Sequence, residues 1–188
     1  MLRSLIVLTF CLLTLLPAAY GREAHVMHVQ PTAPKGQLML DVDIDFTLSS
    51  ELHDAAQKGV PLYFTVDLNI LQPRWWWIDK SVVSTQQTWR IQYNALTRQW
   101  HVTVGQRSLP ATSLDEALDL VRHIRQWPVG APHSLQPGIQ YIGQIQLRLD
   151  TSRLARPFQV DALNSNAWSL NTPWKNFAFS LIDDTPHD

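Results

Sequence analysis

Three segments of the chain alternate apolar and polar residues with a period of two, which is typical of strands buried on one face. They lie at residues 37–46, 60–71 and 139–150. In the first, "QLMLDVDIDF", apolar residues occupy the even positions from Leu38 to Phe46, and aspartates occupy the odd positions from 41 to 45. Each segment is therefore predicted to be a strand with one face on a hydrophobic core and the other in water.

Weaker alternation predicts further strands on both sides of these three. Residues 25–29 are expected to form a short strand, and residues 85–105 to form a hairpin. The turn of that hairpin is "NALT", where the Asn94 side chain can bond its own backbone. The tail "WKNFAFSLI" predicts a last short strand with four buried apolar residues: Trp174, Phe177, Phe179 and Leu181.

Two segments carry the signals of short helices. The first begins after Ser49 or Ser50 and ends at Gly59, since glycine readily takes the left-handed conformation that closes a helix. The second begins at Ser113, which forms a capping box with Glu116. Its apolar stripe keeps helical spacing as far as Ile124. The stripe consists of Leu114, Ala117, Leu118, Val121 and Ile124.

The order of these elements predicts the fold class. Many alternating strands without a strand–helix–strand rhythm predict a mainly β fold made of antiparallel sheets. We expect an immunoglobulin-like β-sandwich with two short helices, and the alternatives are an open β-barrel or an α+β arrangement. Residues 22–188 contain no internal repeat or linker, so they are predicted to form a single β-rich domain.

The N-terminus has the pattern of an export signal. Arg3 supplies a positive charge, residues 5–16 are apolar, and Ala19 and Gly21 are small residues at the cleavage positions. This pattern predicts a signal peptide over residues 1–21 and export, to the periplasm of a Gram-negative bacterium. The alternative is an inner-membrane anchor formed by the apolar run, which is shorter than the ~20 residues that span a bilayer.

Cysteine content and charge exclude several kinds of function. The single cysteine, Cys11, lies in the predicted signal peptide, so the exported chain is expected to hold no disulfide, thiol nucleophile or cysteine-bound metal. The net charge is −1, and loss of Arg3 makes it one unit more negative. Such a chain has no general attraction for nucleic acid or anionic lipid. We therefore expect no nucleic-acid partner, and no stable membrane span after signal cleavage.

The sequence contains no recognisable catalytic motif, neither a nucleophile elbow nor a zinc-protease helix. We therefore expect no enzyme activity and no cofactor. His25 and His28 would point to opposite faces of a strand and would chelate a metal poorly. The row Asp41, Asp43 and Asp45 shares one strand face and is a weak candidate for a calcium or glycosidase-like site. Without a calcium-binding loop, we favour a solvated face that discourages aggregation at a sheet edge.

Three consecutive tryptophans follow an arginine in "RWWWID", and these four residues are the candidate binding residues: Arg74, Trp75, Trp76 and Trp77. Indole rings beside a guanidinium can hold a sugar, a peptide or a lipid headgroup. In an extended segment, Trp75 and Trp77 share one face and Trp76 takes the other. We favour rings that mostly cover one end of the sandwich, with at least one buried and at least one exposed near Arg74. Four more tryptophans are expected in the core: Trp89, Trp100, Trp168 and Trp174.

Several segments together resemble a family of exported proteobacterial proteins known as domain of unknown function 4390. They are "GVPLYF", "RWWWID", "TWRIQYNALTRQW", "SLDEAL", "LRLDTSRLARPFQV" and the late tryptophans Trp168 and Trp174. The resemblance covers about residues 25–180 and implies no catalytic residue, activity or cofactor. It does imply a partner in the cell envelope, with a membrane sensor kinase as the candidate.

Two functions of different classes follow from these features. The first is a non-catalytic periplasmic interaction domain that binds an envelope protein. The alternative is a glycan or small-ligand binding module that uses the Trp75–Trp77 cluster as a stacking platform. An enzyme built on the aspartate row is a third and weaker hypothesis.

Overall fold

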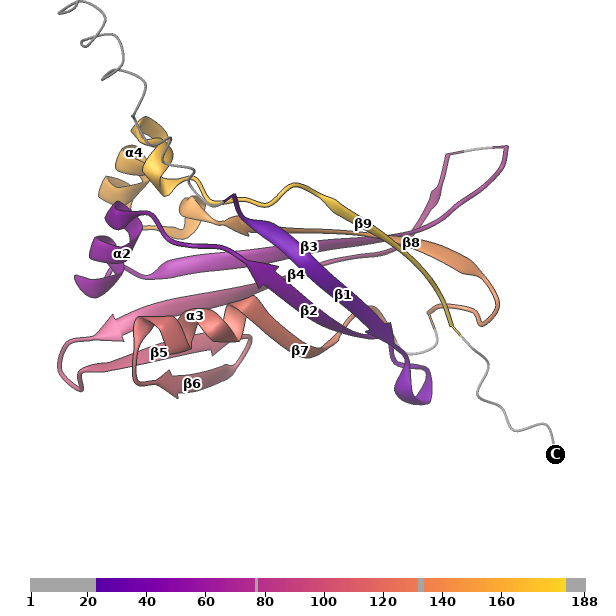
Figure 1. Cartoon of the computed structure of the whole chain (residues 1–188), viewed down its shortest axis with the longest axis horizontal. Coiled ribbons are helices and arrows are strands. Elements are labelled where there is room, and N and C mark those ends of the chain that lie inside the picture. The colour runs from indigo at the N-terminus through magenta and orange to yellow at the C-terminus, as the bar shows by residue number, and fades with distance from the viewer. Residues whose placement is uncertain (1–22, 77, 132–133, 182–188) are drawn as a thin grey trace, which may run out of the picture.

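The computed structural model describes residues 23–76, 78–131 and 134–181, which form two antiparallel sheets (Figure 1). The smaller sheet contains β1 (His25–Thr32), β2 (Met39–Asp45) and β7 (His123–Pro128), in the order β1-β2-β7. The larger sheet contains β3 (Leu62–Gln72), β4 (Lys80–Asn94), β5 (Gln99–Val104), β6 (Arg107–Ala111), β8 (Gln140–Leu149) and β9 (Lys175–Ser180). Its order is β6-β5-β4-β3-β8-β9. The prediction of a mainly β fold with antiparallel sheets is confirmed.

The hydrophobic core lies where the apolar faces of both sheets contribute to one cluster of buried side chains. β3 lies inside the larger sheet, paired with β4 on one side and with β8 on the other. Its even-numbered apolar residues are buried and face this core. Phe64 of β3 is fully buried and its ring centroid lies 5.4 Å from that of Phe46, which follows β2. The alternation predicted for these strands is confirmed.

Both predicted helices are present. In α2 (Ser50–Gln57), the Ser49 hydroxyl accepts a hydrogen bond from the Leu52 amide, and Gly59 has a φ of +88° after the helix. In α3 (Leu114–Arg122), the Ser113 hydroxyl accepts from the Glu116 amide. These serine caps satisfy amide groups that a helix N-terminus leaves without partners.

The helix that begins after Ser113 ends earlier than its apolar stripe predicts. The chain changes to a strand at His123, so Ile124 lies on β7 and not on the helix. Gln126 has a φ of +49°, and this local irregularity leaves Ile124 and Trp127, three residues apart, both buried on the strand. Ile124 follows Val121 by three residues, so it continued the helical spacing of the stripe although it lies on β7.

Other elements lie outside the sequence predictions. The edge strand β6 is mostly exposed, and a third helix, α4 (Arg156–Asn164), begins with Pro157 in its first turn. Three short 3-10 helices complete the described chain: η1 (Pro34–Gly36), η2 (Thr151–Arg153) and η3 (Asn166–Trp168).

The last strand, β9, forms as predicted but is less buried than expected. Trp174 is 47% exposed, so its placement in the core is wrong. Phe177, Phe179 and Leu181 are only half-buried against the core. Phe177 pairs with Gly143 of β8, and its ring occupies the space where a Cβ atom at position 143 would lie.

The predicted signal peptide, residues 1–21, lies outside the described residues. In the part of the chain that the structure describes, no helix has the length and apolar character needed to cross a bilayer.

Candidate functional site

The hairpin of β3 and β4 carries the tryptophan segment at its end, which stands clear of the other strands (Figure 1). Pro73 follows β3 directly and has no N–H group to continue the ladder. The Arg74 amide donates a hydrogen bond of 3.3 Å to Asp79 Oδ1, which holds the turn together. We call residues 74–76 and 78–80 the hairpin tip.

The apolar side chains of the hairpin tip are exposed to solvent. Trp75 is 89% exposed, Trp76 is 66% exposed and Ile78 is 82% exposed. The two indole rings contact each other edge to face, with centroids 4.6 Å apart and an interplanar angle of 86°. These rings therefore contact each other and do not cover the core.

This arrangement corrects the interpretation of the tryptophans as mostly core. Trp75 and Trp76 lie in a turn, so the alternation of an extended segment does not apply to them. Both rings are exposed, and Trp77 lies outside the described residues. Three of the four tryptophans predicted in the core are buried: Trp89, Trp100 and Trp168.

The aspartate row joins two strands of the smaller sheet. Asp41 Oδ1 accepts a hydrogen bond of 2.7 Å from the Gln126 amide, and Asp43 Oδ1 accepts one of 2.5 Å from Arg125. His123 lies 2.9 Å from the same oxygen of Asp43. The hydrogen bonds from His123 and Arg125 hold the pKa of Asp43 below its ordinary value.

The position of β2 corrects the interpretation of the row as a solvated face that discourages aggregation at a sheet edge. β2 lies between β1 and β7, so the aspartates do not protect a sheet edge in the folded protein. Among the described residues, no group of three or more His, Cys, Asp or Glu side chains is placed to hold a metal ion. Asp41 and Asp43 connect β2 to β7 through the contacts of their side chains.

A second network of charges lies at the end of β8. Asp150 accepts hydrogen bonds from Ser152 and Arg153, at 2.6 Å and 3.0 Å, and Arg148 lies 3.5 Å away. Burial alone raises the pKa of Asp150, but these hydrogen bonds and the nearby positive charges outweigh it and lower the pKa. Arg148 also donates to Asp67 at 2.8 Å. The network anchors η2 to the larger sheet.

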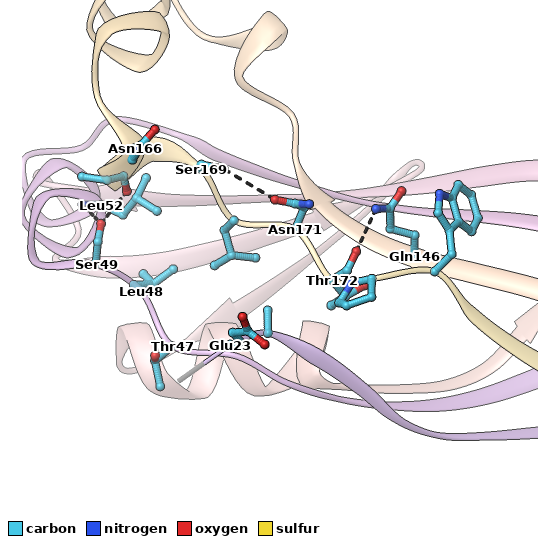
Figure 2. Close-up of a pocket in the computed structure, with 15 residues that line it drawn as sticks. Glu23, Thr47, Leu48, Ser49, Leu52, Gln146, Asn166, Ser169, Asn171 and Thr172 are labelled. Atoms are coloured by element: carbon cyan, nitrogen blue, oxygen red, sulfur yellow. Dashed lines mark hydrogen bonds between the residues drawn. The ribbon is translucent and has the colours of Figure 1, made fainter. Parts of the chain in front are cut away.

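An open groove of about 700 Å³ lies beside the segment that joins η3 to β9 (Figure 2). One wall comes from this segment, and the others come from Glu23, the start of α2 and β8. Its polar lining is mostly uncharged and includes Ser49, Gln146, Asn166, Asn171 and Thr172. Trp174 also lines the groove.

A family model matches residues 21–178 of the chain. The chain belongs to the DUF4390 family, a domain of unknown function. Neither a curated protein nor a solved structure matches this DUF4390 chain.

Sequence reasoning found one of the two candidate sites in this DUF4390 domain. It singled out Arg74 and the tryptophans of the hairpin tip, but it assigned Trp174 to the core and did not find the groove. A signal for the groove is present in "NSNAWSLNTPW", which gathers amide and hydroxyl side chains just before Trp174.

Proposed function

We propose that the protein is an exported, non-catalytic interaction domain that binds a protein of the cell envelope through its hairpin tip. The observation that carries the proposal is the exposure of Trp75, Trp76 and Ile78 at the end of a hairpin that stands clear of the sheet. Large exposed apolar side chains gathered in one place are typical of interaction surfaces. Tryptophan and arginine are also enriched among the residues that dominate binding energy.

The hairpin holds the tip in a defined position before binding. β3 and β4 stay paired from Leu62 and Ile91 to Gln72 and Lys80. The two described indoles already contact each other, so less conformational entropy is lost when a partner orders them. This geometry supports insertion of the rings into an apolar pocket of the partner, with an acidic group placed to meet Arg74.

The hairpin tip is less suited to the two other kinds of ligand, a sugar and a lipid membrane. Rings at 86° to each other do not form one flat platform, so Trp75 and Trp76 are poorly arranged to stack on consecutive sugars. Arg74 and Lys80 are too few positive charges for an anionic membrane, which attracts clusters of four to eight. A protein partner remains the best fit.

Site-specific photocrosslinking tests the proposal. Trp76 is replaced by benzoylphenylalanine in the full chain, and the control places the same group at Leu96, which is 97% exposed in the turn between β4 and β5. We expect one envelope protein to be crosslinked from position 76 and not from position 96. Trp75→Ala should reduce this adduct at least about tenfold, equivalent to ~1.4 kcal/mol of binding, without a change in melting temperature.

Two results would contradict the proposal. Equal adducts from positions 76 and 96 would show random collision. Binding of the purified protein to vesicles of phosphatidylethanolamine and phosphatidylglycerol, lost in Trp75→Ala, would show that the hairpin tip is a membrane contact.

A further inference from the structure

The groove beside Trp174 combines an exposed indole with uncharged hydrogen-bonding groups. We propose that it is a binding site for a neutral oligosaccharide, separate from the hairpin tip. Sugars offer apolar C–H faces that stack on an aromatic ring, and hydroxyl groups that need paired donors and acceptors. The groove supplies both kinds of contact.

The exposure of Trp174 differs from that of the other described tryptophans outside the hairpin tip. Those four are 4% to 8% exposed: Trp89, Trp100, Trp127 and Trp168. Trp174 is 47% exposed. It borders the groove and also a second hollow lined by polar residues of β3 and β4, including Asn69 and Gln86. The indole therefore stands between two polar surfaces that a chain of sugar units can cross.

The hydrogen-bonding groups of the groove are held in place by the backbone beside them. Gln146 Nε2 donates to the Thr172 carbonyl at 2.7 Å, which fixes its amide and leaves the Oε1 side available to a ligand. Asn171 bridges to Arg148 of β8 through the backbone. Figure 2 shows the amide groups of Gln146 and Asn171 pointing toward each other along the groove. A sugar hydroxyl between them can accept from an amide nitrogen.

The charge of the groove selects for an uncharged ligand. Glu23 is the single ionisable group among the described residues that line it. An anionic ligand would find no cation in the groove, and a cationic one would find a single carboxylate at one end. Asp67 lines the second hollow, but its carboxylate is paired with Arg148 at 2.8 Å. The many hydroxyl groups of a neutral sugar match the serine, threonine and amide side chains.

The backbone along the groove disfavours an extended peptide as the ligand. The segment before β9 already occupies the hydrogen-bonding positions beside β8, since the Leu149 amide donates to Leu170 and the Thr172 amide donates to Leu147. A peptide that adds a strand needs an unpaired edge. At this position the edge of β8 is taken, so side-chain contacts must dominate recognition.

Binding measurements with defined sugars test the proposal. Maltotetraose, cellotetraose, tetra-N-acetylchitotetraose and mannotetraose are titrated into the full chain by isothermal calorimetry and ligand-observed NMR. We expect at least one to bind with a Kd of about 1 mM or tighter. Trp174→Ala and Gln146→Ala should each weaken binding at least about tenfold, and Trp174→Phe should restore part of it because the ring face is retained.

The control is Trp75→Ala, which removes an exposed indole of the hairpin tip and should leave sugar binding unchanged. It separates the two proposals, because the crosslinking result depends on Trp75 and the sugar result on Trp174. Failure of all four sugars to bind at ~10 mM would overturn the carbohydrate site. Unchanged sugar affinity in a folded Trp174→Ala variant would also overturn it. So would a neutral tetrapeptide that binds in a Trp174-dependent way when the binding of the sugars does not depend on Trp174.

Discussion

Replacing Gly143 by alanine tests how closely β8 and β9 pack. A Cβ atom on Gly143 would overlap the Phe177 ring, which lies on the paired position of β9. This ring stacks on Phe179, with centroids 5.8 Å apart and planes 22° apart, and Phe179 contacts Tyr141 at 5.8 Å. Displacing Phe177 therefore disturbs a row of three aromatic rings.

Two opposing effects decide the sign of the change in stability. Overpacking a well-filled site costs about 1–3 kcal/mol, whereas removing a glycine from a strand gains roughly 0.5–1 kcal/mol. We expect Gly143→Ala to lower the free energy of unfolding by about 1–2 kcal/mol, and Tm by roughly 2–4 °C per kcal/mol. When Phe177 is also alanine, the obstacle is gone and the same change should stabilise by about 0.5 kcal/mol.

Chemical denaturation of the wild type, both single variants and the double variant measures this reversal. The expected coupling between Gly143 and Phe177 is about 2 kcal/mol, within the range found for residues in contact. Equal effects of Gly143→Ala in both backgrounds would show that Phe177 does not rest on Gly143.

Two further predictions concern stability. Trp89 is 4% exposed and its ring centroid lies 6.4 Å from that of Trp127. Trp89→Ala should therefore lower the free energy of unfolding, measured by urea denaturation, by about 3–5 kcal/mol. A loss below ~1 kcal/mol would place this ring outside the core. Asp150 has a pKa below its ordinary value in the folded protein. Its contribution to the free energy of unfolding is therefore complete above about pH 4 and is lost as the pH falls through the lower folded-state pKa. Asp150→Asn should therefore cost about 1–3 kcal/mol at pH 7, and the difference from wild type should shrink as the pH falls below about 4; a constant difference would refute this origin.

Sequence patterns predicted the strands whose two faces differ most. β2, β3 and β8 bury every second side chain, so alternation located them directly. The same signal fails at β6, which is exposed on both faces for most of its length. It also fails at β7, where the positive φ of Gln126 puts buried residues three apart. Pairing with the distant strand β2 decides β7, and local sequence does not record it. β6 pairs with the neighbouring β5 at the edge of the sheet, where exposure removes the contrast between its faces.

The candidate sites show the same limit. "RWWWID" was recognisable as unusual, but its exposure depends on where the β3–β4 pairing ends, and alternation assumed an extended segment. Trp174 carries an apolar side chain at the start of a strand, which favours a core position. Its ring is exposed because it lies beside the outer, polar surface of β3 and β4 and not between the sheets. Only the three-dimensional arrangement of distant strands gives that information.

The pairing of β2 with β7 joins segments far apart in the sequence, so we expect it to form late in folding. Asp43 and His123 are 80 positions apart in sequence, so this pairing closes a long loop and forms slowly. Until it does, β1 and β2 are a two-stranded hairpin, which is marginally stable in water, with one side of β2 open to other chains. Asp41 and Asp43 then place negative charges beside that open edge and discourage intermolecular pairing. The carboxylates that bind β7 in the folded sheet therefore also discourage other chains from pairing with β2 before β7 has joined it.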